Sequence, residues 1–369
     1  MRHDFETAQP GGQEATENDA MHVSPPGYPL VSVLTPVYNG EKYLAECIES
    51  VLSQTYTNWE YVIINNCSKD RTLEIAADYA SRDRRIRVHN NATFVSMMEN
   101  HNIAVQQMPA ASKYCKMVHA DDWLYPECLA RMVELAEANP SVGIVGANGF
   151  DGSNVLWNQL LPPTAVVPGR EICRRTLLGG FYVFGSQTAL LFRSDLLRQQ
   201  KDFFDVSFFT QFSDNEACFR VLQNADFGFV HQVLTFTRLH EESMTKSIAQ
   251  TAFDGILPGS MRILARYGPV YLTQAEYIQR VKAACGRYHQ FLGRNLLRFR
   301  NSRFREVHLG ALASAGQRLS FFLLTKAVIA ELARPFLSPR RAARKIFRLI
   351  KKTLPKSWFS ESWAKISEQ

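Results

Sequence analysis

The chain has 369 residues, of which 46% are hydrophobic and 21% charged, which is the composition of a globular protein with length for one large domain or two. Its net charge of +7 does not predict a nucleic-acid-binding protein, because eight basic residues and no acidic one lie between Arg340 and Lys356. The seven cysteines form no CxxC pair, which excludes a zinc ribbon and is typical of reduced core cysteines in a cytosolic protein.

The N-terminal segment is polar and has no apolar core, so it is not a secretory signal. We expect residues 1–28 to be disordered and the protein to be cytoplasmic.

From Leu30 onward, strand and helix patterns alternate. Apolar runs predict strands over 30–34, 61–64, 86–89, 114–118 and 142–147, and helical spacing predicts helices between them over 44–52, 73–79, 94–108 and 129–135. Asn39 is a candidate cap for the first of these helices. The alternation predicts an α/β fold with a mainly parallel sheet and helices on both faces.

Polar corners follow successive strands of this predicted sheet. They are TPVYN from Thr35, NNCSKD from Asn65, the region of Asn100, and HADD from His119. Each could be a turn, since Asn, Asp and Ser favour turns for backbone reasons. Four at one sheet edge indicate a ligand site instead. The site is not a dinucleotide or P-loop site, because neither GxGxxG nor GxxxxGK[ST] is present.

Asp121 and Asp122 are the strongest candidates in this set. Adjacent carboxylates at the end of a strand repel one another unless a cation or hydrogen-bond donors offset their charge, and a divalent ion that bridges to phosphates is one solution. The alternative is that one of them caps the helix beginning near Pro126.

The stretch TPVYNGEKYLAECIESVLSQTYTNWEYVIINNCSKDRTLEI, followed by HADDWLYPECL, resembles a family 2 glycosyltransferase with the GT-A fold. The similarity runs from about Val31 to about Thr245. It implies a nucleotide-binding domain over 29–250.

The resemblance assigns residues to a nucleotide and to a metal. It implies a nucleotide site formed by Pro36, Tyr38, Asn65, Asn66, Asn100 and His119, and an Mg²⁺ or Mn²⁺ site formed by Asp121, Asp122 and His240. Asp121 matches the last acid of the family's DXD motif. Two departures are His119 in place of the first Asp of DXD, and Asn65-Asn66 where Asp is common. An amide still forms hydrogen bonds to a base or ribose.

The resemblance also implies that Asp214 is the general base. Capping of the helix that begins near this residue is the alternative from the sequence alone. The expected reaction is inverting transfer from a nucleotide diphosphate sugar, with a UDP-sugar as the expected donor, to a hydroxyl of a glycan or lipid-linked acceptor. Cell-surface polysaccharide or glycoconjugate synthesis is the expected role.

The C-terminal part is expected to be a helical extension over 251–337 and a basic amphipathic tail over 338–369. Charges interrupt the apolar segment 319–337, so it predicts a packing or interfacial helix, not a transmembrane helix. The tail pairs an apolar stripe with a basic one and predicts peripheral binding to an anionic membrane, such as the inner face of the cell membrane. Docking of the tail on the catalytic domain is the alternative.

Two other functions fit parts of the pattern. One is a nucleotidyltransferase on a similar sheet. The other is a sugar-nucleotide-binding or scaffolding protein with impaired catalysis, which the residues His119 and Asn66 make conceivable. The presence of both Asp121 and Asp214 favours an active enzyme.

Overall fold

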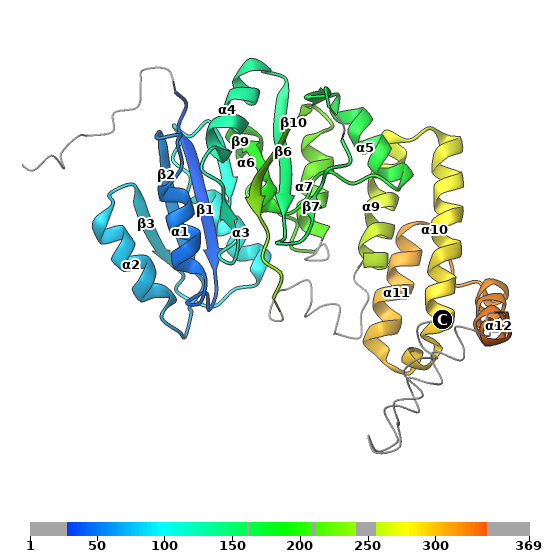
Figure 1. The fold of residues 1–369 in the computed structure, drawn as a ribbon. Coiled ribbons are helices and arrows are strands. Elements are labelled where there is room, and N and C mark those ends of the chain that lie inside the picture. The colour runs from blue at the N-terminus through cyan, green and yellow to red at the C-terminus, as the bar shows by residue number, and fades with distance from the viewer. Residues whose placement is uncertain (1–27, 161, 208–211, 241–255, 338–369) are drawn as a thin grey trace, which may run out of the picture.

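The computed structural model describes residues 28–160, 162–207, 212–240 and 256–337. Within these ranges, a sheet of ten strands carries helices on both faces, and further helices extend from one side of it (Figure 1). The expected disordered segment, apart from Tyr28, and the whole basic tail lie outside the described residues.

The strands range in length from two to eleven residues. They are β1 Val31–Val37, β2 Trp59–Asn65, β3 Ile86–Asn90, β4 Tyr114–Met117, β5 Trp123–Leu124, β6 Val142–Phe150, β7 Val155–Leu156, β8 Val166–Val167, β9 Leu190–Arg193 and β10 Asp226–Phe236. Their order is β3-β2-β1-β4-β9-β6-β10-β5, with β7 beside β6 and β8 beside β10.

The helices divide between the sheet and the extension. Those beside the sheet are α1 Leu44–Leu52, α2 Thr72–Arg82, α3 Met97–Gln106, α4 Cys128–Ala138, α5 Gly169–Leu178, α6 Ser194–Arg198 and α7 Ser213–Val221. Those of the extension are α9 Ile256–Tyr271, α10 Gln274–Arg294, α11 Ser302–Ser314 and α12 Phe321–Leu337. Short 3-10 helices lie at Gln187–Ala189 and Leu296–Arg300.

The expected mainly parallel sheet is confirmed. The ladders of β1 with β2 and β4, of β2 with β3, and of β6 with β10 are parallel. The antiparallel ladders, including those of β9 with β4 and β6, are only two or three residue pairs long. The first four strands in sheet order therefore end at one edge, where their polar corners meet.

Two apolar cores pack against opposite faces of the sheet. In β1, Val33 faces the core formed with α1 and α4, whereas Leu34 faces the core formed with α3, α5 and α7. Both faces of β1 are buried, which explains why its sequence is a continuous apolar run. The second core continues into α9, α10 and α11, so the helical extension shares its interior with the sheet domain.

Asn39 does not cap the first helix. α1 begins at Leu44 after Tyr43, with no side-chain cap. Asn39 has a φ of 51°, and its Oδ1 accepts the Lys69 N–H at 2.9 Å, so it joins the corner after β1 to the corner after β2. Asn favours this left-handed turn conformation more than most residues do.

Candidate active site at the carboxyl edge of the sheet

The acidic corner after β4 is held by hydrogen bonds from distant parts of the chain. Asp122 is 3% exposed; its Oδ2 accepts the Thr188 hydroxyl at 2.7 Å and its Oδ1 accepts the Arg238 N–H at 3.0 Å. The interpretation of Asp121 or Asp122 as a helix cap is wrong, because α4 begins at Cys128 with no side-chain cap. Asp122 instead joins the acidic corner to the 3-10 helix before β9 and to the segment after β10.

The pKa of Asp122 is raised to about 6. Burial is the main cause; Asp121 acts in the same direction, and the positive charge of His119 opposes it. A buried carboxyl of this kind favours its neutral form unless positive charge lies nearby.

Asp121 lies beside two histidines. Ligand atoms of His119, Asp121 and Asp122 lie within 4.8 Å of one another. His240, in the segment after β10, places its Nε2 2.9 Å from Asp121 Oδ2. Imidazole nitrogen and carboxylate oxygen are ligands that Mn²⁺ accepts, while Mg²⁺ prefers oxygen. The residues present therefore fit a divalent cation, and His119, assigned from the sequence to the nucleotide, lies within this cluster.

Arg238 orders the same corner, although it was not among the predicted site residues. Its Nε donates to the Asp121 carbonyl at 3.0 Å, its guanidinium lies 4.3 Å from the centre of the Tyr43 ring, and it pairs with Glu46. The signal available in the sequence was its position two residues before His240. Thr188 gave no such signal, because it lies 66 residues from its partner Asp122.

Asp214 lies in the first turn of α7. Its Oδ1 accepts the Asn215 N–H at 2.8 Å, and no side chain caps the helix at Phe212. Burial raises the pKa of Asp214 to about 6, while the Asn215 N–H and the charge of His119 oppose the shift. His119 thus acts electrostatically on both Asp122 and Asp214, which are far apart in the sequence.

The predicted base pocket has an aromatic rim and a buried amide network. Pro36 is buried in β1, whereas Tyr38 is 44% exposed and its ring centre lies 4.9 Å from that of Phe94. Asn65 donates from Nδ2 to Asn90 Oδ1 at 2.6 Å. These residues surround the ends of β1, β2 and β3.

Asn66 and Asn100 meet at Asn91, which the sequence did not single out. Asn91 Nδ2 donates to Asn66 Oδ1 at 3.0 Å and to Asn100 Oδ1 at 2.8 Å. Asn66 also accepts the Val95 N–H and donates to the Val95 carbonyl, so its amide holds the segment that carries Phe94. A direct contact between Asn66 and a base stays a prediction. Asn91 Oδ1 is buried and has no partner among the described residues.

Similarity to known proteins agrees with this arrangement. Residues 32–199 match the model of glycosyl transferase family 2. The uncharacterized glycosyltransferase EpsJ of Bacillus subtilis is 39% identical over 127 residues, which are 34% of this chain and 36% of EpsJ. The match to EpsE of the same organism covers 56% of EpsE, so the chain spans from about a third to just over half of the length of these relatives.

Solved structures show the same fold. Residues 1–349 of TarS from S. aureus, in complex with UDP-GlcNAc, superpose with a TM-score of 0.59 at 20% identity, covering 85% of this chain and 87% of that one. The mannosyltransferase PcManGT from Pyrobaculum calidifontis, in complex with GDP-Man and Mn²⁺, gives 0.50 at 14% identity, covering 85% and 82%. Residues 32–199 of the chain thus match glycosyl transferase family 2, and the fold is that of the GT-A glycosyltransferases.

Proposed function

We propose that the protein is an inverting, metal-dependent glycosyltransferase that moves a sugar from a nucleotide diphosphate sugar to an acceptor hydroxyl. The observation that carries the proposal is the cluster of His119, Asp121 and Asp122 after β4, whose ligand atoms lie within 4.8 Å of one another. His240 adds a further nitrogen 2.9 Å from Asp121 Oδ2, so the corner has the groups that a divalent cation needs.

Asp121, His119 and His240 would hold the divalent cation, Mg²⁺ or Mn²⁺, with Asp122 behind them. A bound cation would supply Lewis-acid stabilisation of the leaving diphosphate, worth several kcal/mol. Asp122 has both carboxylate oxygens occupied by Thr188 and Arg238, so its role is to fix the corner. Asp121 keeps the more accessible carboxylate of the two.

Asp214 would remove the proton from the acceptor hydroxyl. The acceptor oxygen then forms its bond to the anomeric carbon, the bond from that carbon to the diphosphate breaks, and the nucleoside diphosphate leaves. With one carboxylate assigned to the acceptor side and none to a covalent intermediate, the displacement is direct and inverts the anomeric configuration.

A UDP-sugar is the proposed donor. The rim formed by Tyr38 and Phe94 offers aromatic surface to a base. We choose uridine as the base because of the resemblance to family 2 glycosyltransferases. The acceptor is a glycan or a lipid-linked sugar, in polysaccharide or glycoconjugate synthesis.

Release of nucleoside diphosphate from a panel of UDP- and GDP-sugars, with and without Mn²⁺, tests the function. We expect one donor class to be turned over only with the metal.

Asp121→Ala should weaken metal-dependent nucleotide binding at least tenfold, and an unchanged metal titration in this variant would contradict the metal assignment. Release of diphosphate from a nucleoside triphosphate would indicate a nucleotidyltransferase, and binding without any release would indicate an impaired enzyme.

We also propose peripheral association with an anionic membrane, on the cytoplasmic face, through residues 338–369. Within the described ranges, no helix combines the length and apolar character needed to cross a bilayer. The composition of residues 338–369 supports the proposal, since basic and apolar residues alternate there at helical spacing. We also propose that the glycosyltransferase domain ends near residue 250 and that the helical extension ends near residue 337.

A further inference from the structure

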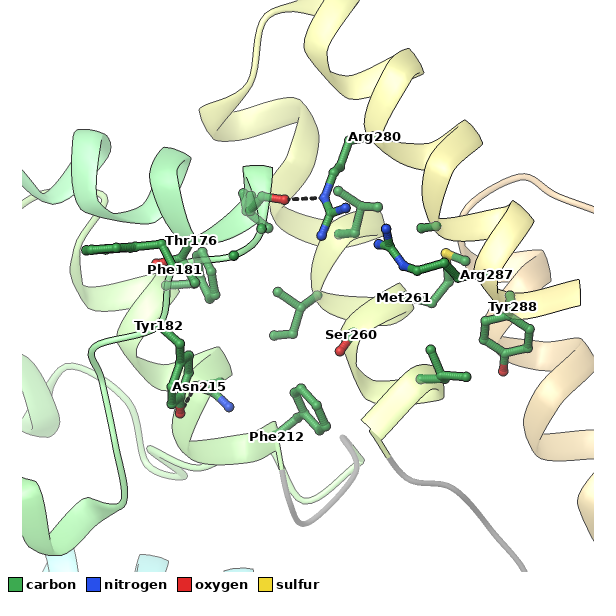
Figure 2. A pocket seen from close by; sticks show the side chains of 18 of the residues that line it. Thr176, Phe181, Tyr182, Phe212, Asn215, Ser260, Met261, Arg280, Arg287 and Tyr288 are labelled. Carbon is green, nitrogen blue, oxygen red and sulfur yellow. Dashed lines mark hydrogen bonds between the residues drawn. The ribbon is translucent and has the colours of Figure 1, made fainter. Parts of the chain in front are cut away.

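A cavity of about 430 Å³ lies where α9 and α10 meet the end of α5 and the first turns of α7 (Figure 2). This is within the size range of small-molecule sites in proteins. Much of its wall is apolar and comes from both the sheet domain and the extension. The apolar residues include Phe181, Phe212, Phe219, Leu257, Met261 and Leu264.

Two arginines on α10 line the same cavity. Arg280 and Arg287 are seven residues apart, on one face of the helix, and Figure 2 shows both guanidinium groups directed into the cavity. Arg280 Nε donates to the Leu177 carbonyl at 2.6 Å, and its guanidinium packs on Gly179, where an added Cβ would lie 2.5 Å from a guanidinium nitrogen. The position of Arg280 is therefore fixed by the backbone at the end of α5.

In the part of the chain that the structure describes, no acidic residue balances these charges, since the residues that line the cavity include neither Asp nor Glu. Among the ion pairs of the described residues, none joins Arg280 or Arg287 to a carboxylate. Burial lowers the pKa of Arg280, and the charge of Arg287 lowers it further, as expected for like charges that approach one another in a partly apolar space. An anion between them would relieve this repulsion and form charge-assisted hydrogen bonds.

The cavity borders the turn that carries the proposed base. Asn215, the residue after Asp214, lines it, and the Tyr182 hydroxyl donates to Asn215 Oδ1 at 2.8 Å from the neighbouring wall. Figure 2 shows Tyr182 and Asn215 on the α7 side of the cavity, with the arginines on the α10 side. The arginines and Asn215, the residue next to Asp214, therefore line the same cavity.

We propose that this cavity binds an anionic amphiphile, a phosphate group joined to a hydrocarbon chain, with the phosphate on Arg280 and Arg287 and the chain against the apolar wall. Resting on the proposed function, we assign this ligand to the acceptor, whose sugar or hydroxyl would be directed to Asp214. Binding depends on both the charged contacts and the apolar ones, so we expect neither a free phosphate nor a neutral amphiphile to bind tightly.

The test is a calorimetric titration of the full-length protein with decyl phosphate below its micellar concentration, without donor or metal. Inorganic phosphate and decyl maltoside are titrated in parallel. We expect decyl phosphate to bind at least tenfold more tightly than either. Equal binding of inorganic phosphate, or equal binding of the neutral maltoside, would overturn the proposal.

Variants separate the two halves of the site. Arg280→Gln and Arg287→Gln should each weaken decyl phosphate binding at least tenfold, whereas Lys282→Gln, which removes an exposed charge of the same helix outside the cavity, should not. Ala284→Phe adds bulk within the cavity without altering charge and should also weaken binding. Arg287 is exposed, so its variant should fold normally, and unchanged affinity in that variant would contradict the site.

The decyl phosphate titration does not depend on turnover of a sugar donor. UDP should not displace decyl phosphate, because the proposed nucleotide site is formed by other residues, and displacement would overturn the assignment of a separate site. A protein that releases no nucleotide from any donor but binds decyl phosphate through the arginines would refute the proposed function and leave this site standing.

Discussion

Asp214 is the residue on which the proposed chemistry depends most directly. Asp214→Asn keeps the size of the side chain and an oxygen for the Asn215 N–H, but it cannot accept a proton from the acceptor. We expect the rate of transfer to fall by about 10² to 10⁴, the usual contribution of a general base, while nucleotide affinity stays nearly unchanged. Kinetics with the donor that the panel of UDP- and GDP-sugars identifies, together with UDP binding, measure the two effects.

The matched control is Asp195→Asn, which alters an exposed carboxylate at the start of α6 that pairs with Arg193. It should retain full activity. An Asn variant at position 214 that transfers sugar at the parent rate would remove the assignment of the base.

The raised pKa of Asp214 also predicts how stability depends on pH. Because the pKa is about 6 in the folded protein, against an ordinary value of 3.8, the folded state holds the proton more tightly than the unfolded state does. The folded protein therefore loses stability relative to the unfolded chain as the pH rises from about 4 through 6. At pH 8, Asp214→Asn removes this penalty.

We accordingly expect Asp214→Asn to be more stable than the parent by about 1 to 2 kcal/mol at pH 8, with the difference shrinking toward pH 5. Urea unfolding at both pH values gives the free energies. An equal or lower stability of the variant at pH 8 would show that the folded protein does not penalise the ionised carboxylate.

At the scale of elements, α7 is joined to the extension through Glu216. This carboxylate is fully buried, lies 3.5 Å from both Arg220 and Arg266, and accepts the Tyr267 hydroxyl from α9. Glu216→Ala would leave buried polar groups without their partner, and we expect a loss of about 3 to 5 kcal/mol in the free energy of unfolding.

Glu134→Ala is the control for this prediction. Glu134 pairs with Arg131 on the surface of α4 and is 70% exposed, so its removal should cost less than about 1 kcal/mol. Urea unfolding compares the two variants. Because Asp214 lies on the same turn of α7 as Glu216, a Glu216 variant that is as stable as the Glu134 variant would mean that the extension does not support the base.

The elements that the sequence predicted well are those with a strong local pattern. Both faces of β1 are buried, so its apolar run identified it, and the corner at Asp121 followed from the strand before it and the helix after it. β5 has only two residues, and its antiparallel pairing with β10 joins segments far apart in the chain, which leaves no local signal.

The sequence predicted which residues form the site better than it predicted the contacts that orient them. Asp121 and His240 lie together, and His119, which the resemblance assigned to the nucleotide, lies with them. The bonds that orient the corner come from Thr188 and Arg238, 66 and 116 residues from Asp122. Asn66 was expected to face a base, and its amide is bonded to the segment around Val95. Hydrogen bonds between distant segments depend on the final packing, which residue type alone does not encode.

At the scale of the whole molecule, α12, the helix that precedes the segment proposed to bind membranes, presents exposed apolar side chains in its first turn. α12 packs on the extension through Leu324 and Ala327, whereas Phe321 and Phe322 are 78% and 77% exposed. Residues 338–369 follow directly. Aromatic side chains beside basic residues are typical of a surface that lies on an anionic bilayer.

We therefore expect the full chain to float with vesicles that contain anionic lipid and to remain behind with neutral vesicles. A chain that ends at Ser338 loses the eight basic residues between Arg340 and Lys356, each worth about 1 kcal/mol near such a surface, and should lose most of this binding. Added salt should weaken the full chain's binding in the same direction, because it screens these charges. Undiminished flotation of the shortened chain would contradict the role of residues 338–369 and indicate that α12 binds the membrane instead. A full chain with both Phe321→Ser and Phe322→Ser then measures the aromatic contribution separately from the basic one.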